Sequence, residues 1–188
     1  MDHYLDLHLR PQPELAPHHL MSALFTRLHR ALVQLQRTDI GVSFPSHDDR
    51  KPTLGTQLRL HGPQASLQAL METTWLRGTE DFLRSSAIAP APGSTAHRVV
   101  GRVQAKSNVE RLRRRAIKRH GLDVATATLR IPDSAAEHLR LPFITLGSRS
   151  TGQPSFPVFI RHGPVLTQPV AGSFNSYGLS QQATIPWF

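Results

Sequence analysis

The side chains best suited to acid–base chemistry in this chain are its histidines. The 188 residues include eleven histidines and no cysteine, which excludes a disulfide, a thiolate metal site and a cysteine nucleophile. An imidazole, with an ordinary pKa of about 6.5, can take the proton from a ribose 2′-hydroxyl, which then attacks the adjacent phosphate. The helical spacing of Leu20, Leu24 and Leu28 places His29 at the edge of a buried face, so His29 is the leading candidate. The same spacing also fits an ordinary boundary histidine.

Four residues nearer the C-terminus are further candidates. Ser148, Ser150 and Tyr177 are able to order a phosphate or a hydroxyl, although Ser148–Gly152 and Tyr177-Gly178 are also ordinary turn sequences. Phe156 is able to stack on a base, and it equally fits a core position on a strand.

The acidic residues do not form the pattern of a metal-dependent nuclease. Such enzymes cluster carboxylates around Mg²⁺. This chain has only 13 Asp and Glu, and its adjacent pairs, Asp48-Asp49 and Glu80-Asp81, lie in polar, loop-like surroundings. If the protein is an enzyme, we therefore expect it to use neither a metal nor another cofactor.

Positive charge is concentrated in one stretch. Residues 102–120 hold eight Lys or Arg and one Glu, a net +7 within a chain of net +9. Ser107-x-x-Glu110 fits a capping box and Gly121 suits the position after a helix end, so the sequence predicts a helix over 107–120. An arc of roughly 140° on this helix contains five cations, which are Arg111, Arg114, Arg115, Lys118 and Arg119.

This localised charge indicates a polyanionic partner. Arginine forks match phosphate groups in geometry, which favours a nucleic acid over a generic acidic protein but does not separate DNA from RNA. The alternative is a solvated charged face, although such faces usually mix charges of both signs.

The periodicity predicts an α+β protein. Strand-like runs at 4–10, 40–44, 57–61 and 97–104 and helical periods at 17–36 and about 67–75 follow the order β-α-β-β-α-β, which is typical of a ferredoxin-like unit. Ser85–Ser94 is typical of a linker, so we expect a ferredoxin-like domain over 1–94 and a smaller C-terminal domain over 95–188 that carries the nucleic-acid-binding helix. The second domain would contain the arginine-rich helix, short helices near 124–130 and after Pro132-Asp133, and a β-hairpin from 143–148 and 156–161.

Several blocks make the chain similar to a known family. The chain resembles the type I-F CRISPR repeat-processing endoribonucleases, and the matching blocks lie in order at 1–6, 20–33, 40–45, 101–115, 141–153, 159–164, 177–180 and 186–188. It departs from the family pattern by one extra residue around Pro154-Ser155 and by Lys118 in place of an arginine.

The resemblance implies a mechanism and a set of site residues. It implies cleavage of precursor CRISPR RNA at the 3′ base of the repeat stem-loop, leaving a 2′,3′-cyclic phosphate. His29 corresponds to the base, Ser148 to the serine that holds the nucleophilic sugar, and Tyr177 to the tyrosine that orients the histidine or the ribose. The expected RNA-binding residues are Arg102, Gln104, Lys106, Ser107, Asn108, Arg111, Arg114, Arg115, Lys118, Arg119, His120, Ser150 and Phe156.

Within this set the resemblance assigns separate tasks. Arg102 and Gln104 would read bases low in the stem, Phe156 would stack under the terminal base pair, and the arginine-rich helix would lie along the major groove. The enzyme would stay bound to the mature RNA as a subunit of the surveillance complex.

The sequence also bears on compartment and on alternative functions. The N-terminal residues lack the apolar segment of a signal peptide, and no apolar run approaches the roughly 20 residues of a membrane span, so we expect a cytoplasmic protein without a membrane partner. The alternatives are a non-catalytic RNA-binding scaffold and a basic ribosomal-type or DNA-binding protein. Ribosomal proteins tend to be basic throughout, so the localised charge argues against the last.

Overall fold

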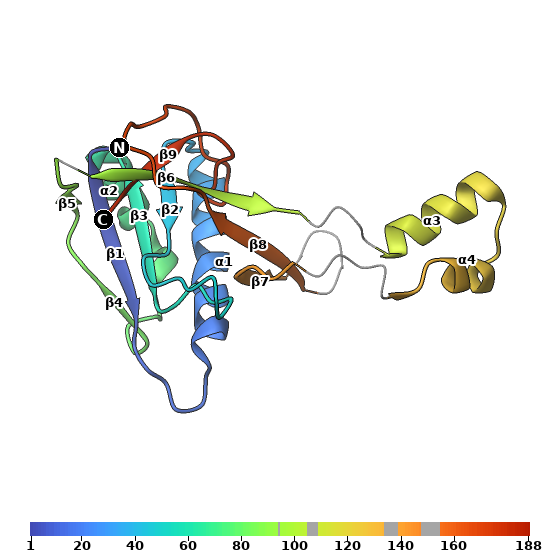
Figure 1. The fold of residues 1–188 in the computed structure, drawn as a ribbon. Coiled ribbons are helices and arrows are strands. Elements are labelled where there is room, and N and C mark those ends of the chain that lie inside the picture. The colour runs from blue at the N-terminus through green and yellow to red at the C-terminus, as the bar shows by residue number, and fades with distance from the viewer. Residues whose placement is uncertain (94, 105–108, 134–138, 148–154) are drawn as a thin grey trace. The chain divides into compact units, whose positions relative to one another are not determined.

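The described residues form helices and two antiparallel sheets, which makes the chain an α+β protein, as predicted (Figure 1). The structure is a computed structural model that describes residues 1–188 except 94, 105–108, 134–138 and 148–154. The helices are α1 (Pro17–Leu35), α2 (Gln64–Glu72), the 3₁₀ turn η1 (Thr74–Leu76), α3 (Val109–His120) and α4 (Val124–Arg130). The strands are β1 (His3–Leu9), β2 (Gly41–Ser43), β3 (Gln57–Gly62), β4 (Leu83–Ser85), β5 (Ala89–Pro90), β6 (Ala96–Val103), β7 (Phe143–Leu146), β8 (Phe156–His162) and β9 (Thr184–Trp187).

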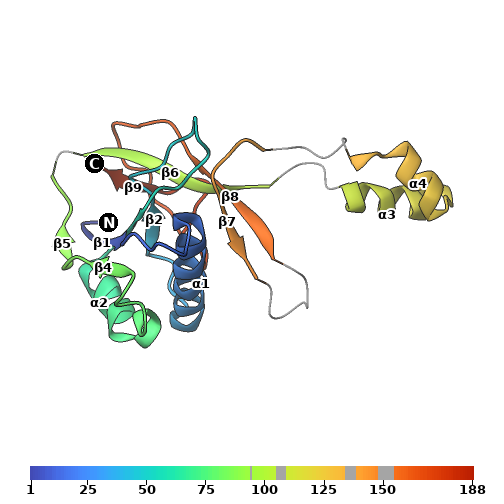
Figure 2. The same cartoon turned by 90° about the horizontal axis from the view of Figure 1, so that it is seen from below.

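The first sheet has the strand order β2-β3-β1-β4, and β5 also pairs with β1. Every neighbouring pair is antiparallel. Helices α1 and α2 lie on one face of this sheet (Figure 2). The alternating Leu5, Leu7 and Leu9 of β1 are buried together with Leu24 and Leu28 of α1, because one stripe of the helix and one face of the strand are apolar.

The second sheet has the strand order β7-β8-β6-β9 and corrects one prediction. The β-like run at 97–104 is a strand, but it does not complete the first sheet: it pairs with β8 and β9 instead. The strand that flanks β1 is the short β4, at the edge of the segment that was expected to be a linker. The predicted hairpin of β7 and β8 is present, with Leu146 opposite Phe156.

The second face of β1 is covered in part, at Asp6, although the alternation predicted one buried face. Asp6 lies on this face and is buried, because Arg59 of β3 binds its carboxylate through Nε at 2.6 Å and Nη2 at 2.9 Å. Arg59 also donates a hydrogen bond from Nη1 to the carbonyl oxygen of Phe188 at 2.7 Å, and its guanidinium lies over the rings of Tyr4 and Phe188. A paired and stacked arginine can be buried where a lone charge cannot.

The chain divides into two compact units, residues 1–103 with 141–188 and residues 104–140. This division does not fall near residue 94, where the composition indicated a domain boundary. The boundary near residue 94 stays a prediction. The smaller unit contains α3 and α4, the latter with the bounds that the sequence predicted. Asp123 caps α4 by accepting a hydrogen bond from the backbone N–H of Thr126 at 2.8 Å. None of the described helices is long and apolar enough to cross a membrane.

Candidate active site and basic helix

His29 lies on α1, half-buried at the edge of the buried stripe, as its position after Leu28 predicted. Its Nδ1 lies 2.9 Å from the backbone carbonyl oxygen of Ser176. A carbonyl oxygen only accepts hydrogen bonds, so Nδ1 must carry the hydrogen. In the neutral imidazole Nε2 is then the nitrogen with the lone pair, which is the form that a general base requires.

Tyr177 packs directly on the His29 ring. The two ring centroids are 4.1 Å apart and the planes are inclined by 14°. Phe25, one helical turn before His29, also faces Tyr177, with a centroid distance of 6.3 Å and an interplanar angle of 3°. Residues four apart share one side of a helix, so Phe25 and His29 together form a surface that receives the tyrosine ring. The structure thus brings together two of the three predicted catalytic residues.

The segment that supplies Ser176 and Tyr177 is fixed by backbone hydrogen bonds to both sheets. Phe174 N–H donates to the carbonyl of Thr38 at 2.8 Å, and Val42 N–H of β2 donates to the carbonyl of Gly178 at 2.9 Å. Ser180 N–H donates to the carbonyl of Val100 of β6 at 3.0 Å. Because β2 is an edge strand, the hydrogen bond from Val42 occupies part of its open edge.

Gly178 is required by this arrangement. Its φ is +70°, and an added Cβ would lie 2.6 Å from Val42 Cγ1. Only glycine adopts this backbone conformation without strain and without displacing the valine.

Arg102 lies near the end of β6, opposite Ile160 of β8. Side chains alternate along a strand, so Arg102 shares a face of the sheet with the buried Val100. The carbonyl oxygen of Arg102 accepts a hydrogen bond from Gln181 Nε2 at 2.7 Å. Residues 174–181 therefore touch His29 at one point and the strand that carries Arg102 at another.

The other predicted RNA-contacting residues have different settings. Gln104 is exposed, and Phe156 is half-buried at the start of β8, where it packs against the hydrophobic core. Five of the predicted site residues lie outside the described residues, namely Lys106, Ser107, Asn108, Ser148 and Ser150.

Helix α3 has one apolar side and one cationic side. Val109 is buried, and Leu112 and Ala116 are half-buried. On the cationic side the exposed residues are Arg111, Arg114, Arg115, Lys118, Arg119 and His120. Within the described part of the chain, no ion pair involves Arg115, Lys118 or Arg119.

Arg113 has a different task on the same helix. It donates from Nε to the carbonyl of Ile131 at 2.9 Å and from Nη2 to Asp133 Oδ1 at 2.9 Å. It therefore joins α3 to the segment after α4, and it was not among the five cations of the predicted arc.

Apart from the His29 site, a half-buried histidine, His47, stacks on a buried one, His162. His162 of β8 is 6 % exposed, and its ring lies 3.7 Å from that of His47. Neither nitrogen of His162 has a hydrogen-bond partner among the described residues. Burial, with the neighbouring His47 and Arg98, lowers the pKa of His162 to about 3.

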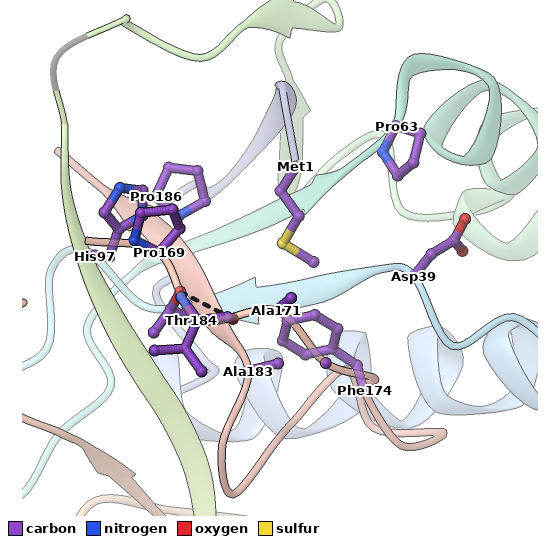
Figure 3. Close-up of a pocket in the computed structure, with 12 residues that line it drawn as sticks. Met1, Asp39, Pro63, His97, Pro169, Ala171, Phe174, Ala183, Thr184 and Pro186 are labelled. Carbon is purple, nitrogen blue, oxygen red and sulfur yellow. Dashed lines mark hydrogen bonds between the residues drawn. The ribbon is translucent and has the colours of Figure 1, made fainter.

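A cavity of about 380 Å³ lies beside β9, lined among others by Met1, His97, Phe174 and Pro186, and includes none of the predicted site residues (Figure 3). Among the described residues, no three His, Asp or Glu side chains are grouped so that they could hold a metal ion.

The geometry defines an α+β protein in which a tyrosine ring stacks on a histidine of the first helix, and which has a separate helix rich in arginine. The family model described as CRISPR-associated protein (Cas_Csy4) matches residues 4–188, so the chain belongs to this family, which confirms the resemblance. The CRISPR-associated endonuclease Cas6/Csy4 of Pseudomonas aeruginosa (strain UCBPP-PA14) is 51 % identical over 188 residues, the whole of both chains. The CRISPR-associated endonuclease Cas6/Csy4 of Escherichia coli (strain UTI89 / UPEC) is 47 % identical, again over the whole of both chains.

Several parts of the site were not predicted from the sequence. The carbonyl of Ser176 and the ring of Phe25 both contact the predicted catalytic pair. Phe25 carried a usable signal, since it stands four residues before His29 on a predicted helix. Ser176 carried only its place beside Tyr177 in a turn sequence.

Proposed function

We propose that this chain is an endoribonuclease that processes precursor CRISPR RNA by cutting at the 3′ base of each repeat stem-loop. Both relatives are named CRISPR-associated endonucleases and match the chain over its whole length. The observation that carries the proposal is the hydrogen bond from His29 Nδ1 to the Ser176 carbonyl, because it leaves Nε2 as the proton acceptor.

The reaction is a transesterification within the RNA. His29 Nε2 takes the proton from the ribose 2′-hydroxyl, and the 2′-oxygen forms a bond to the adjacent phosphorus. The bond from phosphorus to the 5′-oxygen breaks, which leaves a 2′,3′-cyclic phosphate on one product and a 5′-hydroxyl on the other. One proton leaves the 2′-hydroxyl and one ends on the 5′-oxygen, so the step is balanced without a metal ion or another cofactor.

Two further residues would support this step. Tyr177 holds the imidazole plane through its stacked ring, which supports the orienting role that the resemblance implies. Ser148 would hold the nucleophilic sugar. General-base catalysis of this kind is typically worth about 10²- to 10⁴-fold in rate.

RNA binding is assigned to a second set of residues. The cationic side of α3 would lie in the major groove of the stem near the hairpin loop, where an otherwise deep and narrow A-form groove opens. Arg102 and Gln104 would read bases low in the stem, and Phe156 would stack under the terminal base pair. The remaining contacts would come from Lys106, Ser107, Asn108, Arg111, Arg114, Arg115, Lys118, Arg119, His120 and Ser150. The product hairpin would stay bound, and the protein would then join the other subunits of a type I-F surveillance complex.

We also infer a ferredoxin-like unit within residues 1–94 and an RNA-binding region after it. The support for the first is the element order β1-α1-β2-β3-α2-β4 together with the antiparallel strand order β2-β3-β1-β4. The support for the second is the cationic side of α3, since fold alone does not assign a function.

The test is cleavage of the chain's own repeat RNA in EDTA by the unmodified protein and by His29→Ala. We expect the unmodified protein to cut in EDTA, and His29→Ala to cut about 10²- to 10⁴-fold more slowly with nearly unchanged hairpin affinity. His18→Ala is the matched control, since His18 is exposed on the same helix. An absolute need for Mg²⁺, or normal cleavage by His29→Ala, would contradict the proposal.

A modified substrate examines the same step from the RNA side. A single 2′-deoxy nucleotide 5′ to the scissile phosphate should bind but remain uncut, because the attacking oxygen is missing. Cleavage of this substrate would mean that water attacks, and the roles of His29 and Ser148 would both be wrong.

A further inference from the structure

Asn175 is the hydrogen-bonding centre of the turn that contacts His29. Its side-chain Oδ1 accepts hydrogen bonds from the backbone N–H of Tyr177 at 2.9 Å and of Leu179 at 3.2 Å. Its own carbonyl accepts from Gly178 N–H at 2.8 Å, and its N–H donates to the carbonyl of Leu179 at 2.9 Å. Asn and Asp side chains favour such turns because their oxygen reaches the N–H two residues on.

Both groups that contact the His29 imidazole belong to this turn. The Tyr177 N–H that donates to Asn175 Oδ1 and the Ser176 carbonyl that accepts from His29 belong to the same peptide group. The ring stacked on His29 belongs to the next residue, Tyr177. The direction of the carbonyl and the position of the ring therefore depend on the same side-chain oxygen.

The tautomer of His29 depends on that carbonyl. An imidazole whose Nδ1 has no acceptor is free to place its hydrogen on Nε2, and Nε2 then cannot accept a proton. Which nitrogen of a histidine keeps its lone pair is set by the hydrogen bond that the other nitrogen makes. A turn that moves the Ser176 carbonyl thus changes the fraction of His29 that can act as a base through Nε2.

We propose that Asn175 is a positioning residue: by fixing the turn 175–179 it holds His29 as the Nδ1–H tautomer, with Nε2 directed to act as the base. The proposal rests on the proposed function of His29 as the general base. The side chain is the decisive part, because an alanine at 175 still supplies the backbone carbonyl and N–H but has no side-chain acceptor, whereas an aspartate keeps an acceptor oxygen at the same place.

Three backbone hydrogen bonds that anchor this segment, one of them at Gly178 within the turn, do not involve the Asn175 side chain. They are the bonds from Phe174 N–H to Thr38, from Val42 N–H to Gly178 and from Ser180 N–H to Val100. We therefore expect Asn175→Ala to fold and to change the turn locally.

The experiment compares Asn175→Ala with Asn175→Asp. Single-turnover cleavage of the repeat hairpin at saturating protein should be slowed about tenfold in Asn175→Ala, with unchanged hairpin Kd, since two hydrogen bonds are lost. Asn175→Asp keeps the acceptor and should cut near the unmodified rate. Ser173→Ala is the control, because Ser173 is exposed and precedes the turn. Equal slowing by Ala and Asp at 175, or no slowing by Ala, would overturn the proposal.

A spectroscopic measurement separates positioning from simple loss of structure. Imidazole ¹⁵N shifts, assigned with His29→Ala and recorded at about pH 8, where a free imidazole is neutral, report which nitrogen carries the hydrogen. We expect Nδ1–H in the unmodified protein and in Asn175→Asp, and a shift toward Nε2–H in Asn175→Ala. An unchanged tautomer in a slowed Asn175→Ala would overturn the positioning role.

This readout also separates the two proposals. Normal cleavage by His29→Ala would refute the role of His29 as the general base, whatever the tautomer. The positioning of His29 by Asn175 would still be judged by the ¹⁵N shifts, which do not depend on catalysis.

Discussion

The buried histidines should make the stability of this protein depend on pH between about 5 and 7. Burial lowers the pKa of His162, with His47 and Arg98 as further causes, and that of His61, each to about 3. The ordinary value of about 6.5 applies in the unfolded chain. As the pH falls through 6.5 the unfolded chain binds these two protons and the folded chain does not, so the free energy of unfolding decreases down to about pH 3.

The magnitude follows from the size of this shift. One pKa unit corresponds to about 1.4 kcal/mol, so a single histidine of this kind lowers the free energy of unfolding by about 2 kcal/mol between pH 7 and pH 5. His162 and His61 together therefore account for about 4 kcal/mol over this interval. The hydrogen bond from Arg37 lowers the pKa of Asp39 to about 2, so this carboxyl group of the folded chain titrates well below the interval from pH 5 to pH 7.

The perturbation is His162→Phe. A phenyl ring has nearly the shape of the imidazole, and the rings of His47, Phe44 and Trp187 already surround this site. We expect the decrease between pH 7 and pH 5 to fall by about half, to about 2 kcal/mol. At pH 7 the variant should be at least as stable as the unmodified protein, because His162 has no hydrogen-bond partner for either ring nitrogen among the described residues.

The assay is urea unfolding followed by tryptophan fluorescence at pH 5, 6 and 7. Val158→Ala is the matched control, since Val158 is fully buried on the same strand and its truncation should lower stability at every pH without changing the slope. A slope in His162→Phe equal to that of the unmodified protein would refute the reasoning, because it would mean that His162 does not stay neutral in the fold.

Three further predictions concern RNA binding and the His29 site. Arg115→Ala should weaken hairpin binding and reduce the slope of log K against log salt concentration by about 1, with unchanged cleavage at saturating RNA. Arg84→Ala, on the exposed side of β4, should change neither the affinity nor the slope. Equal behaviour of the two variants would exclude a contact between Arg115 and the RNA groove. Tyr177→Phe should cut at the unmodified rate and Tyr177→Leu about 2- to 10-fold more slowly, because an aromatic pair is worth about 0.5–1.5 kcal/mol; a defect in the Phe variant would assign the role to the hydroxyl. Gly178→Ala should lower Tm and slow cleavage, because its φ is +70° and its Cβ would lie 2.6 Å from Val42 Cγ1; an unchanged Tm would show that the turn is pliable.

The elements that sequence reasoning located well are those with strong periodicity. The alternation of Leu5, Leu7 and Leu9 and the helical period through Leu28 predicted both ends of β1 and of α1 to within one residue. The strand at 96–103 was found, but its sheet was not, because its partners are residues 156–162 and 184–187, far downstream. Leu83–Ser85 was missed because three residues are too few to show an alternation.

The site divides in the same way. The helical period placed His29 at the edge of a buried face, and the structure has it half-buried there. The helical period could not predict which residue contacts His29. A turn sequence such as Asn175–Gly178 specifies its own local hydrogen bonds, but it does not specify the helix against which the turn packs. The family resemblance selected Tyr177, and the stacking on His29 is the geometry that such a role needs. The roles given to His29, Tyr177, Ser148 and Ser150 all stay predictions.

The hydrogen bond between His29 and Ser176 joins residues 147 positions apart in the chain. During synthesis the first helix emerges long before the residue that orients its imidazole, since the N-terminal part of a chain is made first and can fold first. The growing chain can therefore form the first sheet, and even present the basic helix α3, while His29 still lacks its acceptor. On the proposed function, a nascent chain would bind repeat RNA before it could cut, so the onset of cleavage would coincide with completion of the last residues rather than with the appearance of the binding surface.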